Sequence, residues 1–444
     1  MAPLVSLKRH NRLFLLGLLV LTLAVRGGVL LARYRDLAAD PDGYRQLATN
    51  LVQQGVYGYG ESDESAGDSS IRPSAFRPPL YPLVLACAGG TSGAGQAVIA
   101  VLHFLMGVAT VALIYVLSQR WQLGGWGLLA AALTACDPIL LNQSTLLMTE
   151  TLATLLAVVG LVCLTRLNER PTLVSAAMAG GALATASLCR PTFLVWLAAV
   201  AVLLMLSSCF QSVRQKVFGA AEPELTGGLW RCLITLLLVA VGVLSPWICR
   251  NYVALGRPIV ATTHGGYTLM LGNNDGFYDF LQQGRWGDIW DSCELDERYN
   301  RIKQQLDDDE VEADRWAREQ AVTCIQRRGG MFVYSCAVRI GRLWGPVPHQ
   351  VDSSESMAKR LARYAVGLWY VLVFLFAAIG VSSLGRRLFH SPWIWGLLVC
   401  LSFTAVHTVY WSNLRMRAPL MPVVAMAAAF GAKRIAERRG DNRP

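Results

Sequence analysis

The chain has 444 residues, of which 54% are hydrophobic and 16% are charged, with a formal net charge of +10. Soluble domains carry about 25% charged residues, so this composition and repeated apolar runs of about 20 residues exclude a large soluble protein. The basic residues lie mostly in short segments between the apolar runs, and no nucleic-acid-binding motif occurs, so the charge favours membrane orientation over a nucleic-acid partner.

The apolar runs predict an all-α integral membrane protein with about ten transmembrane helices. The first run is long and has no small-x-small cleavage site after it, so we expect a retained anchor and not a signal peptide. A further apolar segment, Leu80–Ala88, is too short to span a bilayer alone. The predicted spans are Leu13–Leu31, Val98–Leu117, Gly125–Leu141, Leu146–Leu164, Val174–Leu188, Phe193–Leu206, Leu229–Ile248, Tyr364–Val381, Trp393–Tyr410 and Pro419–Phe430.

The first polar segment after the first span, residues 33–82, contains a predicted juxtamembrane helix. Asp40 is expected at its N-cap and Pro41 in its first turn, and Gly55 is expected to end it. Apolar residues recur on one face at helical spacing from Tyr44 onwards, a pattern that suits a helix on a membrane surface. The following stretch, Gly58–Ser70, is rich in Gly, Ser, Asp and Glu and is expected to be mobile.

Charge bias predicts the sidedness of the segments. With a cytoplasmic N-terminus, the short basic loops fall inside and the C-terminus is cytoplasmic too. Residues 33–82, 137–145, 189–191, 250–363 and 411–417 then face outwards. The inside cations are Arg120, Arg166, Arg170, Arg214, Lys216, Arg231, Arg386, Arg387, Lys433, Arg434, Arg438 and Arg439.

Three parts follow from this topology: a membrane core (residues 1–249) with the first external loop, a large external loop (250–363), and C-terminal helices with a basic tail (364–444). The large loop is long enough for a small subdomain, and residues 294–327 are charged and helix-prone. It also holds Cys293 and Cys324, which could pair if the loop is extracytoplasmic, although spacing alone leaves this open.

Charged groups at a membrane edge are costly, which makes them candidates for function. Asp40 and Asp42 could accept a proton, or could simply cap a helix and favour its dipole. Glu150 opens the fourth span and has the same alternative. Five arginines at the predicted outer face could bind phosphate or extend to lipid head groups: Arg77, Arg190, Arg250, Arg415 and Arg417. No paired His or Cys spacing supports a metal site.

An acid four residues before an aromatic in the first external loop (Asp40, Tyr44), followed by Arg77-Pro78-Pro79, resembles the GT-C glycosyltransferases. The most similar groups are bacterial relatives of protein O-mannosyltransferases and of lipid A aminoarabinose transferases, glycosyltransferase families 39 and 83. Arg415-Met416-Arg417 is similar to the Arg-Tyr-Arg-x-Pro unit that opens the final helix there. The resemblance extends over residues 40–257 and the final helix.

The resemblance implies that Asp40 is the catalytic base, with Asp42 in reserve, and that the donor is a polyprenyl-phosphate sugar held by the arginines. Glu150 and Tyr44 would orient the sugar or the acceptor. Two positions depart from the family pattern: Pro41 stands where these families often have Glu, and Phe76 precedes Arg77 where an acid can occur, which leaves a bound metal unsupported. No other cofactor is expected.

We therefore expect an inverting glycosyltransferase of a bacterial plasma membrane, acting at the extracytoplasmic face on a lipid, protein or polysaccharide acceptor. One alternative is a transporter or flippase of lipid-linked sugars, which would favour inverted repeats and mid-membrane charges that the sequence does not display. A second alternative is a ligase of the same fold class that transfers a whole glycan.

Overall fold

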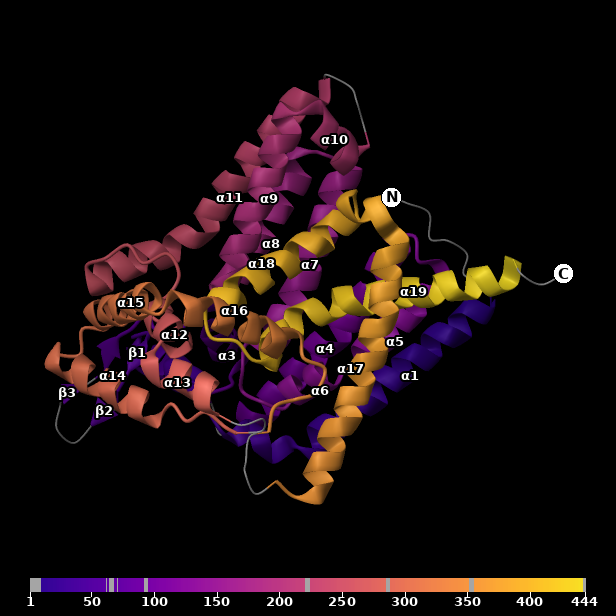
Figure 1. The fold of residues 1–444 in the computed structure, drawn as a ribbon. Coiled ribbons are helices and arrows are strands. Elements are labelled where there is room, and N and C mark those ends of the chain that lie inside the picture. The colour runs from indigo at the N-terminus through magenta and orange to yellow at the C-terminus, as the bar shows by residue number, and fades with distance from the viewer. Residues whose placement is uncertain are drawn as a thin grey trace.

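The structure is a computed structural model that describes residues 9–60, 62–63, 68–69, 71–91, 95–219, 224–284, 288–350 and 355–441. Long helices form a bundle, and shorter helices of the large loop pack together with the first-loop strands on one side of it (Figure 1). Of the basic N-terminal segment, residues 1–8 lie outside the described part. The helices of the bundle are α1 (Arg9–Ala32), α3 (Leu80–Ala88), α4 (Gly95–Arg120), α5 (Gly127–Ala135), α6 (Pro138–Ser144), α7 (Glu150–Glu169), α8 (Leu173–Cys189), α9 (Thr192–Cys209), α10 (Gln211–Phe218), α11 (Glu224–Leu255), α17 (Met357–Leu384), α18 (Trp393–Val409) and α19 (Met421–Asp441), with 3-10 turns η2 (Gly124–Trp126), η3 (Gly385–Phe389) and η4 (Leu414–Leu420).

The helices confirm an integral membrane protein of the predicted polytopic class. Among the described residues, seven helices are long and apolar enough to cross a membrane, and an eighth span results if α5 and α6, which meet at a bend of 49°, count as one. α8 and α18 also coincide with predicted spans, but each has only 17 residues. The predicted count of ten is therefore not confirmed.

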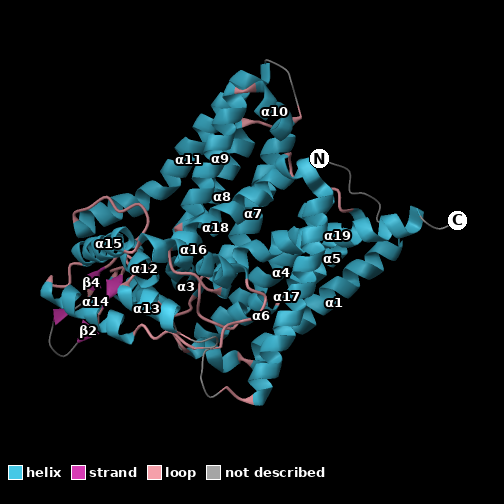
Figure 2. Cartoon of the chain, viewed as in Figure 1, coloured by secondary structure: helices cyan, strands magenta, loops and turns pink. Residues whose placement is uncertain are grey.

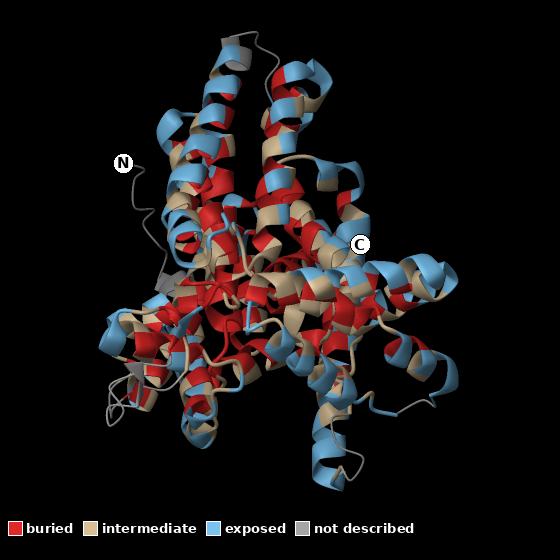
Figure 3. Cartoon of the chain, turned by 90° about the vertical axis from the view of Figure 1, so that its left-hand side faces the viewer, coloured by how far each residue is buried: buried red, intermediate tan, exposed pale blue. Residues whose placement is uncertain are grey.

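Burial divides these helices into a centre and a periphery. In the apolar windows, 72% of α7 and 78% of η4–α19 is buried, but only 17% of α1 and 22% of α17–η3. Figure 3 shows this as a buried centre surrounded by helices with exposed outer faces. The exposed faces carry Leu, Val, Ile and Phe side chains, which a bilayer would solvate. α7 and η4–α19 therefore form the framework around which the other helices pack.

Small residues bring two helix pairs into backbone contact. A Cβ on Gly431 of α19 would lie 2.0 Å from the Phe376 carbonyl oxygen of α17, and one on Gly380 of α17 would lie 2.1 Å from that of Ala427. Gly180 of α8 approaches the Leu236 carbonyl oxygen of α11 in the same way, at 2.3 Å. Such close approach increases van der Waals contact between helices where apolar lipid supplies no hydrophobic driving force.

The first loop begins with a 3-10 turn, η1 (Tyr34–Ala38), followed by α2 (Tyr44–Gln54). The predicted helix start at Pro41 is wrong: α2 starts three residues later, after Gly43 with φ 71°. The Asp40 carboxylate nevertheless caps α2, because it reaches forward to the backbone N–H groups of Tyr44, Arg45 and Gln46. The helix ends at Gly55, as predicted, again with positive φ.

Short strands follow α2 (Figure 2). β1 (Gly58–Tyr59) pairs antiparallel with β4 (Arg72–Pro73), and β2 (Ser62–Asp63) with β3 (Asp68–Ser69). Residues 61, 64–67 and 70 lie outside the described part, so the predicted mobility of Gly58–Ser70 falls partly on residues that the structure does not describe. β4 leads directly into Phe76 and Arg77, and then into α3, whose bounds equal the predicted short apolar segment.

The large loop forms five helices with their own small apolar cores. The predicted helical stretch 294–327 is interrupted because Asp307 and Asp308 have positive φ, at 52° and 60°. Cys293 and Cys324 are both free, so the disulfide left open by the sequence is not formed. The helices are α12 (Gly265–Gly272), α13 (Asp275–Gln283), α14 (Cys293–Gln305), α15 (Glu310–Arg327) and α16 (Gly329–Trp344).

Polar contacts join segments that were predicted to share a face. Arg33 of the first loop bonds Asn142, and Arg72 bonds Asp308 of the large loop. On the predicted inner face, Arg120 pairs with Glu169, and Lys433 donates to the Gln122 carbonyl oxygen. Each of these contacts pairs residues that the charge-based topology assigns to the same face.

Replacing Gly431 with alanine should weaken the α17–α19 contact, because the new Cβ has no room beside the Phe376 carbonyl. Overpacking of this kind costs about 1–3 kcal/mol. The apparent melting temperature of the detergent-purified protein should fall. Gly242→Ala on α11 is the matched control, since nothing lies within 4 Å of a Cβ there. Equal melting of the Gly431 variant and the wild type would contradict the packing argument.

Candidate functional site

The first half of the candidate site is an ion pair within the first loop. Arg77 Nη2 lies 2.8 Å from Asp42 Oδ1, and Arg77 Nε donates to the Asp42 carbonyl oxygen at 3.3 Å. Both side chains are 18% exposed, so the pair is reachable from solvent. The guanidinium carbon also lies 5.2 Å from the Phe76 ring centre and 5.7 Å from that of Tyr44. The two rings and the Asp42 carboxylate together fix the direction of the forked guanidinium group of Arg77, called the Arg77 fork below.

Asp40 has a different environment from Asp42. Its Oδ1 accepts from the Tyr44 N–H at 2.8 Å, and its Oδ2 from those of Arg45 and Gln46 at 2.9 and 3.1 Å. These bonds hold the carboxylate rigidly and take up three of about four acceptor positions. Asp42 uses Oδ1 for Arg77, and its Oδ2 has no hydrogen-bond partner among the described residues.

The second half is built around Glu150, the first residue of α7, which is 2% exposed. Glu150 Oε1 lies 3.0 Å from Arg190 Nη1 at the α8–α9 turn and 3.6 Å from Arg415 Nε in η4. A buried carboxylate needs such partners because its desolvation costs several kcal/mol. Three segments far apart in the sequence therefore meet at one charge.

Both arginines also contact thioether sulfur. Arg190 Nη2 lies 2.7 Å from Met416 Sδ, and Arg415 Nη1 lies 3.6 Å from Met148 Sδ. Thioether sulfur is a weak acceptor for a guanidinium donor. In addition, Glu150 Oε2 and His407 Nε2 make no hydrogen bond with the described residues, and Arg190 Nη1 and Arg415 Nε face only Glu150 Oε1. The guanidinium groups of Arg190 and Arg415 therefore have more N–H donors than the described residues offer them acceptors.

Tyr44 connects the two halves. It is 4% exposed and packs edge-on against Tyr81 with 5.3 Å between ring centres. Burial raises the pKa of its hydroxyl, and the charges of Arg77, Asp42, Glu150 and Arg190 all act on it. Charges from both halves therefore reach one ring, so the predicted residues Asp42, Tyr44, Arg77, Glu150, Arg190 and Arg415 form a single site.

Arg250 and Arg417 lie in structural contacts instead. Arg250 donates to the backbone carbonyls of Tyr57 and Ser74 and lies 5.3 Å above the rings of Tyr57 and Trp247. Arg417 is fully buried, donates to the carbonyls of Leu343 and Gly345, and lies 4.3 Å from the Tyr370 ring centre. Their predicted phosphate contacts have no support from these positions and stay predictions.

His264 and His407 adjoin the site and were not predicted as part of it. His264 packs edge-on against Phe76 at 4.3 Å and stacks on Tyr267 at 5.3 Å. Burial, and then the charge of Arg77, lower its pKa well below the usual value, so it is neutral at physiological pH. No sequence spacing identifies either residue, because both reach the site through long-range packing.

No group of three His, Cys, Asp or Glu residues suited to a metal occurs among the described residues.

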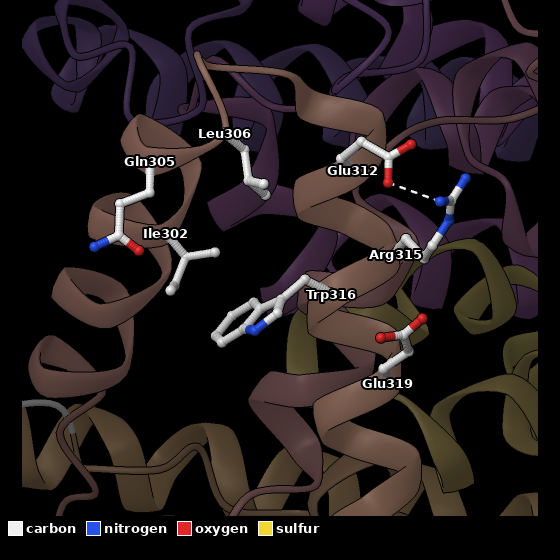
Figure 4. Close-up of a pocket in the computed structure, with 7 residues that line it drawn as sticks. All are labelled: Ile302, Gln305, Leu306, Glu312, Arg315, Trp316 and Glu319. Carbon is white, nitrogen blue, oxygen red and sulfur yellow. Dashed lines mark hydrogen bonds and ion pairs between the residues drawn. The ribbon is translucent and has the colours of Figure 1, made fainter.

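A separate pocket lies between α14 and α15 in the large loop (Figure 4). It has a volume of about 260 Å³, and none of its lining residues was predicted to belong to the site. Trp316 and Leu306 extend into the space between the two helices. The pocket is lined by Ile302, Gln305, Leu306, Glu312, Arg315, Trp316 and Glu319.

Comparison with known proteins bears out the resemblance read from the sequence. Residues 76–221 match the family described as dolichyl-phosphate-mannose-protein mannosyltransferase, a range that contains Arg77, Glu150 and Arg190. No curated protein matches the chain.

Solved structures with a similar fold include the oligosaccharyltransferase of Archaeoglobus fulgidus. Its apo form gives a TM-score of 0.56 at 15% identity over 98% of this chain and 51% of that one. Its complex with an inhibitory peptide and a dolichol-phosphate gives 0.53 at 14% identity over 97% and 51%. ArnT from Cupriavidus metallidurans, bound to undecaprenyl phosphate, gives 0.42 at 14% identity over 97% and 79%, too low to add to the assignment.

The fold is thus that of the polytopic GT-C class of membrane proteins, as predicted. The chain spans about half the length of the oligosaccharyltransferases that it matches.

Arg417→Ala should lower both the yield of folded protein and its melting temperature. The substitution leaves two backbone carbonyls without their donor, at about 1–3 kcal/mol for each buried group. Arg257→Ala, whose side chain is 56% exposed, should melt close to the wild type. A thermal-shift assay in which Arg417→Ala melts no lower than Arg257→Ala would contradict the structural role of Arg417.

Proposed function

We propose that the protein transfers a sugar from a polyprenyl-phosphate donor to an acceptor hydroxyl at the extracytoplasmic face of a bacterial plasma membrane. The GT-C fold and the matched family support a lipid-linked donor. The single observation that carries the proposal is the pair Arg190 and Arg415, whose guanidinium groups contact methionine sulfur beside a buried carboxylate.

A phosphate would satisfy these arginines better than the present contacts do. Charge-assisted hydrogen bonds to phosphate oxygen are strong, and the guanidinium fork suits them. Arg190 and Arg415 share one carboxylate, that of Glu150, so this half of the site carries an excess of positive charge. A donor phosphate there would balance that excess and replace the contacts with methionine sulfur.

In the proposed reaction the acceptor oxygen attacks the anomeric carbon as the bond from that carbon to the phosphate oxygen breaks. The acceptor proton passes to a first-loop carboxylate, and polyprenyl phosphate leaves with the bonding electrons. One displacement inverts the anomeric centre. The arginines stabilise the negative charge on the leaving phosphate, an electrostatic contribution that needs no proton transfer.

Asp40 is our first choice for the proton acceptor, and Asp42 is the alternative. The resemblance places Asp40 at the catalytic position, and its backbone bonds leave about one of its four acceptor positions for a proton. Asp42 is oriented by Arg77 through Oδ1, and its Oδ2 has no partner among the described residues, which is also the geometry of a positioned base. Glu150 and Tyr44 would orient the sugar from the side of α7 and α2.

The three proposed parts of the chain would have different roles in the reaction. Residues 1–249, with the loop 33–82, would hold the donor, and the large loop 250–363 would select the acceptor. The C-terminal part would supply Arg415. Both proposed boundaries lie within helices, since α11 continues to Leu255 and α17 begins at Met357, so the parts would work as one packed body.

One observation bears on the transporter alternative, namely two buried charged side chains. Asp137 and Arg26 are both buried, at the α5–α6 bend and within α1. Their contacts are nevertheless those of fixed groups: Asp137 caps α6 and accepts from the Tyr370 hydroxyl, and Arg26 donates to the Thr134 carbonyl oxygen. Such contacts favour a static core over an alternating pathway.

Asp40→Asn should reduce transfer of radiolabelled sugar from polyprenyl-phosphate donors by about 100-fold or more, as loss of a general base does. Asparagine can still cap α2 with one oxygen, which limits structural damage. Asp42→Asn is assayed in parallel at matched expression, and Asp36→Asn, an exposed first-loop aspartate paired with Arg33, is the control.

If only Asp42→Asn abolishes transfer, Asp42 is the base. If all variants transfer equally, the first-loop carboxylates have no catalytic part. Absence of transfer by the wild type, with uptake of labelled lipid across the bilayer, would favour the transporter. The size of the product separates transfer of one sugar from transfer of a whole glycan.

Arg190→Lys and Arg415→Ala should each raise the KM for the donor about 10- to 100-fold, since one charge-assisted bond to phosphate contributes about 1.5–3 kcal/mol. Affinity for undecaprenyl phosphate, measured by binding to the purified protein, should fall in parallel. Arg257→Ala, an exposed arginine near Glu312, is the control. Unchanged affinity in both variants would remove the phosphate-binding assignment.

A further inference from the structure

The turn between α14 and α15 makes a buried contact with the first loop. Glu310, the first residue of α15, is 8% exposed. Its Oε2 accepts from the Ser74 hydroxyl and its Oε1 from the Ala75 N–H, both at 2.6 Å. Both oxygens of one large-loop carboxylate are therefore bonded to the segment that directly precedes Phe76 and Arg77.

The turn has a specific conformation for this contact. Asp307 and Asp308 adopt positive φ, a backbone conformation that residues other than glycine seldom adopt. It persists only where the surrounding structure imposes it. Arg72 of β4 donates to the Asp307 carbonyl oxygen and pairs with the Asp308 carboxylate at 2.9 Å. Asp309 caps α15 through the N–H groups of Val311 and Glu312.

The same segment is bonded on its other sides. Arg250 Nη1 donates to the Ser74 carbonyl oxygen at 2.8 Å, and the Thr263 N–H donates to that of Ala75 at 3.0 Å. The Phe76 N–H donates to Ser74 Oγ, and the Phe76 ring packs on His264. Residues 74–76 thus owe their position to α11 and the large loop as well as to their own sequence.

We propose that Glu310 is a positioning residue of the donor site, which fixes residues 74–76 and thereby the direction of the Arg77 fork. The proposal rests on the function proposed above, in which Arg77 binds the donor phosphate. Glu310 itself touches neither donor nor acceptor. Through Glu310 the large loop becomes part of the phosphate site. Glu310 is 235 residues away in the sequence from Ala75, whose backbone N–H it binds.

A carboxylate suits this position because it offers two acceptor oxygens to two donors of one segment. With alanine at 310, the buried Ala75 N–H and the Ser74 hydroxyl would lose their acceptor. With glutamine, the amide oxygen can accept from Ala75 while the amide nitrogen donates to Ser74 Oγ. The glutamine variant is therefore the conservative substitution that should rescue the position.

The test compares Glu310→Ala, Glu310→Gln and Glu319→Gln in full-length protein in lipid nanodiscs. Glu319 lies on the same helix but lines the α14–α15 pocket and makes no bond to the described residues of the first loop, so it is the matched control (Figure 4). The first readout is amide hydrogen exchange in peptides covering residues 74–77. The second is binding of undecaprenyl phosphate, and the third is the split of transfer kinetics into KM and kcat.

In Glu310→Ala, exchange at Ala75 and Phe76 should rise at least tenfold, undecaprenyl phosphate should bind about tenfold more weakly, and the donor KM should rise more than kcat falls. Glu310→Gln should recover most of each change, and Glu319→Gln should match the wild type. Global melting temperatures are recorded to separate local release from unfolding.

Unchanged exchange in Glu310→Ala would overturn the proposal, as would raised exchange with unchanged phosphate binding, which would leave Glu310 a structural residue only. If the wild type does not bind undecaprenyl phosphate at all, the proposed function fails and positioning of a phosphate site fails with it. The exchange data would then still establish whether Glu310 holds residues 74–76, so the two failures are distinguishable.

Discussion

The buried charge of Glu150 is the constraint on which the site depends. A carboxylate at 2% exposure is tolerable only with cations beside it, and the cations come from the α8–α9 turn and from η4. Satisfying this charge brings the start of α7, the end of α8 and the segment before α19 to one point. α7 and η4–α19 are also the most buried spans, so the most rigid part of the bundle carries the charge.

The first loop is the complementary part, and polar contacts fix the direction of its chain. Asp40 fixes the start of α2, Asp42 fixes Arg77, and Arg250 and Glu310 hold the backbone between β4 and Arg77. Each of these groups is an acceptor or donor matched to a backbone partner or an opposite charge. These bonds add to the apolar contacts among Leu47, Tyr57, Ala75 and Trp247 and give the loop a defined shape, and a preorganised cation favours phosphate binding.

Several elements could be predicted from the sequence because their cause is local. α3 has the bounds of the short apolar segment, α2 follows the helical spacing that begins at Tyr44, and the apolar runs coincide with helices. The start of α2 could not be predicted, since Gly43 takes a positive φ and Asp40 reaches across the intervening turn. The break at Asp307 and Asp308 was missed for a similar reason: the turn is held by Arg72, which is remote in sequence.

The candidate site was predictable in its residue types and only partly in its members. Five arginines on one predicted face look alike in sequence, yet Arg250 and Arg417 meet backbone carbonyls whereas Arg190 and Arg415 meet sulfur and a carboxylate. Likewise, nothing near Glu310, His264 or His407 in the chain marks them as neighbours of Arg77 or Arg190.

By itself the sequence determined the membrane class, the approximate spans and which charged residues lie at their ends, because hydropathy and charge act along the chain at short range. Only the tertiary structure decided which of those charges meet. A buried hydrogen-bond donor needs an acceptor, and the packing of the whole chain decides which residue supplies it.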